Sequence, residues 1–460
     1  MQEKAKADFN AVEKVASYAA NLRFEDLDEA TIQKGQRIVL DTLGCALKGR
    51  QTPLGRRIAD FVVLKEFGNE ATVHGDGRRS SLEGAAWANA NLAKRSIDDV
   101  HRVCGHIAAQ VVPTALVVGE HKRVDGKTLI KAIAAGYEVT GAIQPVVKAW
   151  QRARGLDPKA HVGSMACAVT AAMPMGLSEK QIGSALGLAM DMAAGTEQYV
   201  YDGPLADHLL SGHGARNGVY AAKLADFGFR GPPGALDGGW GYFISYGDGY
   251  DPQYLANIGN LGILAGTAYK WHAGCRQIHS TADAALHLVS KGQPRVEDIA
   301  SIEVGTYKNA MTPAFRVNAD PKNWNEAAFS IPVTVSLILT RGSLQKEDIE
   351  AFDSPERRRL WPLTRVYLDE EIQAEYPQKN GTVVRVTTTD GRQYEGRVSY
   401  PKGEPENPLS DTDLEYKFRR QVGSLLTEAR CQQIFETCYR LEELDDVSEL
   451  VRLAIPEEIP

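Results

Sequence analysis

Most of the first 230 residues follow a helical repeat, in which apolar residues or Ala recur at three- and four-residue spacing. Small residues are dense in this part of the chain, above all from Gly163 to Gly176 and from Gly183 to Gly195. Gly and Ala are often buried, so these runs favour close helix packing in a large core. The pattern predicts helices at 10–21, 29–48, 81–94, 107–119, 127–141, 162–175, 178–193 and 210–227.

Strand patterns begin only after about residue 265. Residues 299–307 alternate in polarity, and segments 382–389 and 392–400 flank Asp390-Gly391, which predicts a hairpin with a two-residue turn. Segments 281–288, 330–339 and 411–455 have helical spacing. We therefore predict a mainly α protein with two domains. A large all-helical domain would combine residues 1–267 with 401–460, and a smaller α+β domain would cover 268–400.

Composition narrows the classes of partner. The 460 residues carry 52 Lys and Arg against 59 Asp and Glu, so no basic excess favours nucleic acid. No run of 18 apolar residues predicts a membrane span, and the first residues do not resemble a secretory signal. Six scattered cysteines without a CxxC pair fit a reducing compartment. We expect a cytoplasmic protein with a small-molecule substrate and without nucleic acid or a membrane as partner.

Seven of the ten histidines fall in four short windows that also contain Asp, Lys or Arg. An imidazole titrates near pH 7, so such groups are well suited to general acid–base catalysis. A metal site built from His and Asp is the competing interpretation, but no HxH or HxxxH spacing supports it. No dinucleotide, P-loop, HExxH or GxSxG motif is present, so we predict neither a metal nor a cofactor.

Motifs that can be compared with known families occur in segments 40–49, 86–113, 134–139, 215–218, 228–231, 236–238, 326–330, the hairpin, and 407–411. Together these segments resemble the MmgE/PrpD family, which includes 2-methylcitrate dehydratase, cis-aconitate decarboxylase and iminodisuccinate epimerase. The resemblance runs in matching order over nearly the whole chain. It implies a helical domain made from both chain ends, an α+β lid domain, a homodimer, and cofactor-free chemistry between the domains.

Two parts of the family pattern are retained. His106 aligns with the family's catalytic histidine, and Asp98 belongs to the Asp-Asp pair that precedes it, although Ser96 replaces an aspartate. In the α+β region, Lys270 matches the family's lysine. The residues that follow this lysine, Cys275, Arg276 and His279, resemble the Cys-Arg and His that often come after it.

Two other positions differ from the family. Asp157 replaces a histidine, and Asp207 replaces a substrate-binding lysine. Two unit charges about 4 Å apart interact by roughly 4 kcal/mol at an effective dielectric of about 20, so exchanging attraction for repulsion costs a carboxylate up to about 8 kcal/mol. A tricarboxylate held in the family's usual position is therefore not expected as the substrate.

The resemblance and these exchanges predict a lyase of dehydratase or decarboxylase type that abstracts a proton next to a carboxylate or carbonyl. His106 is the predicted general base or acid, and Lys270 stabilises the developing enolate oxygen. Asp157 and Asp207 orient His161 or His208, or bind a cationic or hydroxyl group. The remaining predicted substrate-binding residues are Ser96, Asp98, Cys275 and Arg276. An epimerase or isomerase with the same proton chemistry, and a catalytically silent binding or structural paralogue, remain alternatives.

Overall fold

The computed structural model describes residues 11–95, 105–199, 209–247, 253–292, 294–312 and 314–457. These residues form two compact units. The helical unit contains the described residues of Met1–Tyr199, His208–Thr267 and Asp411–Pro460, and the α+β unit contains those of Ala268–Ser410. The protein is mainly α-helical, with two small sheets.

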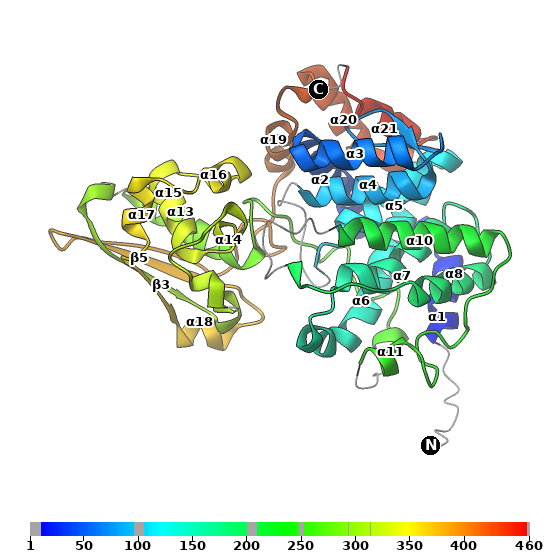
Figure 1. Ribbon diagram of the computed structural model, residues 1–460, viewed down its shortest axis with the longest axis horizontal. Helices are drawn as coiled ribbons and strands as arrows, with labels where there is room; N and C mark the ends of the chain where they lie inside the picture. The colour runs from blue at the N-terminus through cyan, green and yellow to red at the C-terminus, as the bar shows by residue number, and fades with distance from the viewer. Residues whose placement is uncertain are drawn as a thin grey trace. The chain divides into compact units, whose positions relative to one another are not determined.

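The helical unit begins with α1 (Ala11–Asn21), α2 (Glu29–Gln51), α3 (Pro53–Lys65) and α4 (Leu82–Arg95) (Figure 1). A two-stranded hairpin, β1 (Ala71–Thr72) and β2 (Arg79–Ser80), lies between α3 and α4 in the sequence. The helices that follow are α5 (Ala108–Lys122), α6 (Gly126–Arg154), α7 (Pro158–Ala172), α8 (Glu179–Asp191), α10 (Leu210–Asp226), α11 (Tyr242–Ser245) and α12 (Gln253–Ala256). All eight helices predicted before residue 230 are present.

Two predicted helix boundaries need correction. The helix predicted at 127–141 continues to Arg154 as α6, through the internal Pro145. Buried apolar residues on both sides of this proline, Ile143 and Val147, keep the chain in the core, which offsets the lost backbone hydrogen bond. Helix α7 begins at Pro158, four residues before the predicted start, because Asp157 caps it and Pro favours the first helical position.

The C-terminal helices α19 (Asp411–Val422), α20 (Glu428–Tyr439) and α21 (Ser448–Leu453) belong to the helical unit, and Figure 1 shows α19 beside α2. A fully buried ion pair joins these two helices, with Lys417 Nζ 2.6 Å from Asp41 Oδ1. A second pair, between Arg37 Nε and Asp411 Oδ1 at 2.6 Å, is half-exposed. Charge pairing and packing therefore fix the end of the chain on α2.

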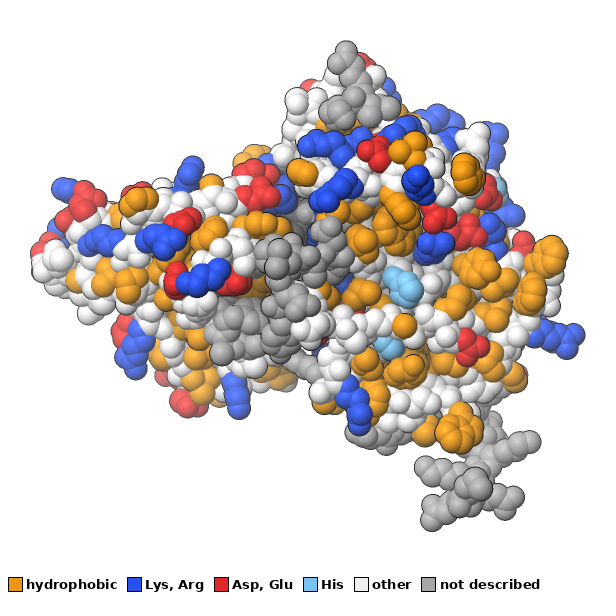
Figure 2. All heavy atoms as spheres, in the orientation of Figure 1, with side chains coloured by type: hydrophobic (Ala, Val, Ile, Leu, Met, Phe, Trp, Pro, Cys, Tyr) orange, Lys and Arg blue, Asp and Glu red, His pale blue; other side chains and the backbone are white. Residues whose placement is uncertain are grey.

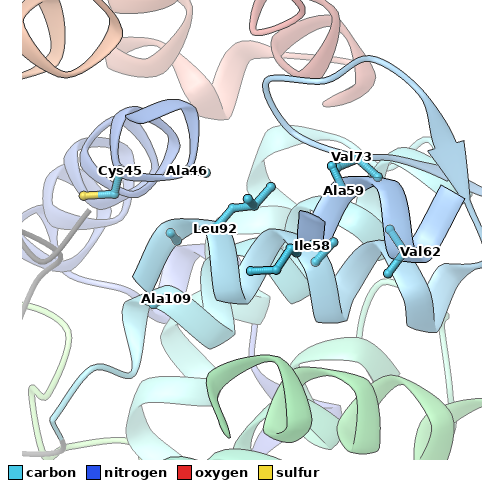
Figure 3. Close-up of a cluster of buried hydrophobic side chains, with 10 residues drawn as sticks. Cys45, Ala46, Ile58, Ala59, Val62, Val73, Leu92 and Ala109 are labelled. Carbon is cyan, nitrogen blue, oxygen red and sulfur yellow. The ribbon is translucent and has the colours of Figure 1, made fainter. Parts of the chain in front are cut away.

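A core cluster of the helical unit combines branched aliphatic side chains with several alanines. This cluster includes Cys45 of α2, Ile58 and Val62 of α3, Leu92 of α4 and Val73, which follows β1 (Figure 3). The alanines of this cluster, among them Ala46 and Ala59, let the helices approach closely, as the sequence pattern predicts. No helix among the described residues is long and apolar enough to cross a bilayer.

The α+β unit contains a four-stranded sheet in the order β4-β3-β5-β6. Strand β3 (Ile299–Thr306) pairs in parallel with β4 (Thr364–Leu368) and antiparallel with β5 (Thr382–Thr388), which pairs antiparallel with β6 (Gln393–Val398). Helix α13 (His279–Lys291) packs on β5 and β6 (Figure 1). The other helices are α14 (Trp324–Ala327), α15 (Ile331–Arg341), α16 (Lys346–Glu350), α17 (Pro355–Leu360) and α18 (Glu370–Glu375).

The predicted hairpin is present, but its loop is one residue longer than predicted. Thr388 N donates to Arg392 O at 2.9 Å, which leaves Thr389, Asp390 and Gly391 between the strands. Gly391 has φ +84°, the left-handed conformation that closes a three-residue loop. Asp390 accepts hydrogen bonds from Thr388 Oγ1 at 2.6 Å and from Arg392 N at 3.3 Å. The sequence pair Asp-Gly therefore marked the turn, but not its length.

Candidate active site

The N-terminal ends of helices α5, α7 and α10 meet at one buried amide. Gln110 of α5 donates through Nε2 to the carbonyl oxygen of Lys159 in α7 at 2.8 Å and of Ser211 in α10 at 3.1 Å. A Cβ at Gly163 or Gly214 would lie within 2.4 Å of this side chain, so only glycine leaves room for it. The segments that hold His106, His161 and His213 are therefore brought together around Gln110.

A buried ion pair occupies the start of α7. Lys159 Nζ lies 2.6 Å from Asp157 Oδ2, and both side chains are almost fully buried. The Tyr199 hydroxyl lies 3.1 Å from each of these two atoms. An antiparallel bridge between Leu156 and Thr196 brings Tyr199 to this end of α7. The Asp157 carboxylate is thus held by a lysine and a tyrosine that were not among the predicted site residues.

Two histidines of the helical unit lie on the helices that meet at Gln110: His161, two residues after Lys159 in α7, and His213 in α10. His161 is 1% exposed; its Nε2 lies 3.3 Å from Gly195 O, and its Nδ1 has no hydrogen-bond partner among the described residues. The rings of Tyr246 and Tyr242 flank it at centroid distances of 5.1 and 6.3 Å. His213 is half-buried, with Nε2 3.1 Å from Asn217 Nδ2. Histidine side chains reach the surface of the helical unit (Figure 2).

Burial favours the neutral form of both imidazoles. It lowers the pKa of His161, although the Gly195 carbonyl and the Asp157 charge oppose part of this effect. Burial also lowers the pKa of His213, and the nearby Arg216 charge adds to the decrease. Because an unperturbed imidazole has a pKa near about 6.5, both side chains are neutral at pH 7 and can accept a proton.

The Lys159–Asp157 ion pair, in contrast to the two histidines, favours the charged form of its basic group. Burial by itself lowers the pKa of Lys159, but the Asp157 charge and Tyr199 outweigh it, so the net pKa is raised. Burial raises the pKa of Tyr199 to about 12. The lysine therefore stays protonated and the tyrosine keeps its proton. The Lys159 charge is already compensated by Asp157, which leaves this pair close to neutral overall.

The predicted residues of the α+β unit form a second buried cluster. Lys270 Nζ donates to Gly274 O at 2.9 Å, and Cys275 Sγ donates to Gln277 Oε1 at 3.0 Å. Arg276 forms a buried ion pair with Glu404, a residue that the sequence analysis did not single out. The partner lies far along the chain, so only the fold could identify it. As with Lys159, the charge of Arg276 is met by a carboxylate.

Two further histidines belong to this second cluster. His272 and His279 are buried, with ring centroids 5.5 Å apart in an edge-to-face arrangement. His272 Nε2 lies 2.7 Å from Asp283 Oδ1, and the other oxygen of Asp283 accepts a hydrogen bond from Lys402 N at 2.6 Å. Asp283 thus fixes the His272 ring and the backbone at Lys402 at the same time.

Of the other predicted site residues, the structure describes only His106. His106 is half-buried and lies two residues before α5, four residues before Gln110. Ser96, Asp98, Asp207 and His208 lie outside the described residues. No group of three or more His, Cys, Asp and Glu side chains within the described ranges could hold a metal ion.

Comparison with known proteins decides the family. The model of the MmgE/PrpD N-terminal domain matches residues 13–255, and that of the MmgE/PrpD C-terminal domain matches residues 272–441. The chain belongs to the MmgE/PrpD family. The described candidate residues of the helical unit fall within the first match, and Cys275, Arg276 and His279 fall within the second, which begins two residues after Lys270.

Three MmgE/PrpD relatives with similar sequences have cis-aconitate decarboxylase in their names. Cis-aconitate decarboxylase of Aspergillus terreus is 25% identical over 98% of both chains. Cis-aconitate decarboxylase of Homo sapiens is 26% identical over 96% of this chain and 94% of its own. The cis-aconitate decarboxylase-like protein oryM of Aspergillus oryzae is 24% identical over 96% of this chain and 97% of its own. This MmgE/PrpD protein is thus similar to lyases over its whole length.

Proposed function

We propose that this protein is a cofactor-independent lyase, of decarboxylase or dehydratase type, that acts on a small polar acid other than the usual tricarboxylates. A dehydration begins with abstraction of a proton next to a carboxylate or carbonyl, and hydroxide leaves the neighbouring carbon. In a decarboxylation, the carbon that loses CO₂ keeps the electron pair and takes up a proton from the general acid. His106 acts as the general base or acid, and Lys270 stabilises the developing enolate oxygen. Full-length similarity to cis-aconitate decarboxylases supports the lyase class.

The proposal that the substrate is not a tricarboxylate rests on Lys159, because Asp157 already compensates the charge of this lysine. Lys159 Nζ is 2.6 Å from Asp157 in a buried position. A substrate carboxylate at this lysine would compete with Asp157 and would feel its repulsion at short range, where a pair of unit charges interacts by several kcal/mol. Arg276 is matched by Glu404 in the same way. At Lys159, a substrate with three carboxylates therefore finds no unpaired cation, whereas a mono- or dicarboxylate with a hydroxyl or amino group needs fewer unpaired cations.

The neutral histidines support the proton chemistry. A general base must be unprotonated at the working pH, and burial lowers the pKa of both His161 and His213. In the helical unit these imidazoles lie near the start of α5, which His106 precedes. We propose that His161 orients the substrate through its Nδ1, which lacks a hydrogen-bond partner among the described residues.

Solvent deuterium exchange tests the proposal. The purified protein is incubated in D₂O with a panel of small mono- and dicarboxylic acids and with cis-aconitate, and NMR follows deuterium incorporation and product. Elimination or loss of CO₂ from a panel acid, without turnover of cis-aconitate, supports the proposal. Exchange or inversion without net elimination assigns an isomerase. The absence of all exchange assigns a silent paralogue, and efficient turnover of cis-aconitate contradicts the substrate assignment.

The role of His106 is tested on the acid that turns over. His106→Ala is expected to lower kcat by about 10²- to 10⁴-fold, because the contribution of a positioned general acid or base lies in this range. His121→Ala, which changes an exposed histidine of the same unit, is the matched control and should keep wild-type turnover. Full activity of His106→Ala would show that another group moves the proton.

A further inference from the structure

A pocket of about 570 Å³ lies in the helical unit, where α2 meets the C-terminal helices α19 and α20 (Figure 1). Pockets for small molecules usually measure about 300–1,000 Å³, so a compact organic molecule fits this volume. We call it the α2–α20 pocket and define it by six of the residues that line it: Glu29, Gln36, Arg37, Asp411, Tyr439 and Glu442.

The charge of Arg37 is already compensated inside this pocket. Its Nε and Nη2 atoms donate to the two carboxylate oxygens of Asp411 at 2.6 and 2.9 Å, and its Nη1 donates to Gln33 O at 3.2 Å. The Tyr439 hydroxyl donates to Asp411 O at 3.4 Å. Both donor side chains therefore bind acceptors of the protein, which leaves little to attract an anionic ligand.

The two glutamine amides of the pocket also direct their donors to the protein. Gln36 Nε2 donates to Tyr439 O at 3.0 Å and to Glu442 Oε2 at 2.6 Å. Gln33, which also lines the pocket, donates through Nε2 to Glu29 Oε1 at 2.8 Å. Each side-chain donor atom of the lining thus has an acceptor within the protein.

The acceptors of the lining, by contrast, are not all used. Gln36 is only 6% exposed, and its Oε1 accepts no hydrogen bond from the described part of the chain. The second carboxylate oxygens of Glu29 and Glu442 also have no donor among the described residues. A buried acceptor without a donor is unfavourable, so this lining suits a ligand that donates hydrogen bonds.

The lining also carries an excess of negative charge. The carboxylates of Glu29, Asp411 and Glu442 stand against the single guanidinium of Arg37, which Asp411 compensates. Two negative charges therefore remain. Tyr439 is the last residue of α20, and the carbonyl groups at the C-terminal end of a helix add partial negative charge. These charges attract a cation.

Apolar groups of the same pocket favour an organic cation. Phe24 and Ile32 line it beside the Tyr439 ring. Both aromatic rings already lie near a cation of the protein. The Arg37 guanidinium is 5.8 Å from the Tyr439 ring centroid, and Lys127 Nζ is 5.4 Å from that of Phe24. A metal ion would instead need several ligands at one point, and the described residues contain no such group.

We propose that the α2–α20 pocket binds a small aliphatic amine in its protonated form, and that a diamine matches its two uncompensated charges. Ammonium groups supply the donors for Gln36 Oε1 and for the carboxylates of Glu29 and Glu442, while the methylene chain packs on Phe24 and Ile32. The site uses no residue of the candidate active site, so the proposal does not depend on the proposed reaction.

Isothermal titration calorimetry of the full-length protein with putrescine, a four-carbon diamine, tests the proposal. Putrescine is expected to bind the wild type and to raise its unfolding temperature, because a ligand of the folded state stabilises that state. The four-carbon diol of the same length is the neutral control and should do neither. Equal binding of the diol, or an equal rise in unfolding temperature with potassium chloride at the same ionic strength, overturns the proposal.

Glu442→Gln tests the residues of the pocket. The variant keeps an acceptor for Gln36 but removes one charge, so the dissociation constant of putrescine should rise by about 10-fold or more, since hydrogen bonds to charged groups are the stronger ones. Glu443→Gln is the matched control, because this neighbour is exposed and pairs with Arg440. Equal dissociation constants of the two variants contradict the assignment. Glu29→Gln, which changes an exposed lining residue, replaces Glu442→Gln if that variant does not fold.

A lysine side chain of a second copy of this chain would present the same ammonium group. Analytical ultracentrifugation with and without putrescine distinguishes the two sources. An unchanged sedimentation coefficient supports a free amine as the ligand. Dissociation of an oligomer by putrescine would assign the pocket to a lysine of the second copy and would overturn the proposal.

Discussion

The buried histidines of the two units differ in what surrounds their rings. His74 and His161 of the helical unit and His272 of the α+β unit are all at most 2% exposed. His272 lies 2.7 Å from the carboxylate of Asp283. His161 instead lies 3.3 Å from a backbone carbonyl, and the Nε2 of His74 has no hydrogen-bond partner within the described part of the chain. Equal burial therefore leads to different chemistry.

These surroundings give the buried histidines two different roles. In the helical unit, burial lowers the pKa of His74 to about 4 and also lowers that of His161, so both rings are neutral at pH 7. A neutral imidazole can accept a proton, as the proposed reaction requires. In the α+β unit, Asp283 holds His272 in place and also binds the backbone of Lys402. That histidine has the contacts of a structural residue.

The largest effect is expected from the ion pair next to His161. Lys159→Met leaves Asp157 buried with its charge uncompensated, which should lower the free energy of unfolding by about 3–5 kcal/mol. Urea denaturation followed by circular dichroism measures the change. Adding Asp157→Asn to Lys159→Met should recover most of the loss.

A matched control for this prediction exists in the α+β unit. Lys322 pairs with Asp320 at the same two-residue spacing, but both side chains are exposed. Lys322→Met should therefore leave the unfolding curve unchanged. Equal effects of Lys159→Met and Lys322→Met would mean that burial of the first pair has no energetic weight.

The pH dependence of stability tests whether burial keeps His74 of the helical unit neutral. The folded pKa of His74 is about 4, below its ordinary value of 6.5, so the unfolded chain binds a proton first as the pH falls. Stability should decrease between about pH 6.5 and pH 4, by about 3 kcal/mol from this residue, because each pKa unit corresponds to about 1.4 kcal/mol.

Unfolding free energies measured at a series of pH values check this expectation. His74→Gln should remove most of the decrease, since glutamine does not titrate. His121→Gln, which changes an exposed histidine, should keep the wild-type slope. If His74→Gln and the wild type lose stability in parallel, carboxylates rather than this histidine control the acid response.

A smaller effect is expected from the partner of His272. Asp283→Asn keeps the size of the side chain but weakens the charged hydrogen bond to His272, at an expected cost of about 1–2 kcal/mol. Thermal or urea unfolding of the variant gives the value. Glu303→Gln, in an exposed pair with Arg365, serves as the control and should change little. A neutral result for Asp283→Asn would remove the distinction between the two units.

Sequence pattern predicted the regular elements well where the signal is local. All eight helices before residue 230 and the hairpin are present, because apolar periodicity and turn residues act over a few neighbours. The errors occur where tertiary contacts override the local pattern. The helix predicted to end at residue 141 continues through Pro145 as α6, because buried residues on both sides of the proline keep it in the core. Strand β4 was not predicted, since its five residues derive their order from parallel pairing with β3.

The candidate site was less predictable. Lys159 stands two residues after Asp157 in the sequence, so this pair could have been recognised from the Asp-Pro-Lys start of α7. No local signal joins Arg276 to Glu404 or His272 to Asp283, because these pairs form only when distant segments pack. The predicted roles of His106 and Lys270 remain predictions for the kinetic experiments.

The sequence by itself determined the helical framework, the hairpin and the family, since periodicity and motifs need no knowledge of distant contacts. Tertiary structure alone decided which charges are compensated and which imidazoles are neutral. A charge state depends on desolvation and on partners within a few ångströms, and packing sets both. Asp157 was predicted as a site residue from the sequence, but the compensation of its charge by the buried Lys159 is a property of the fold.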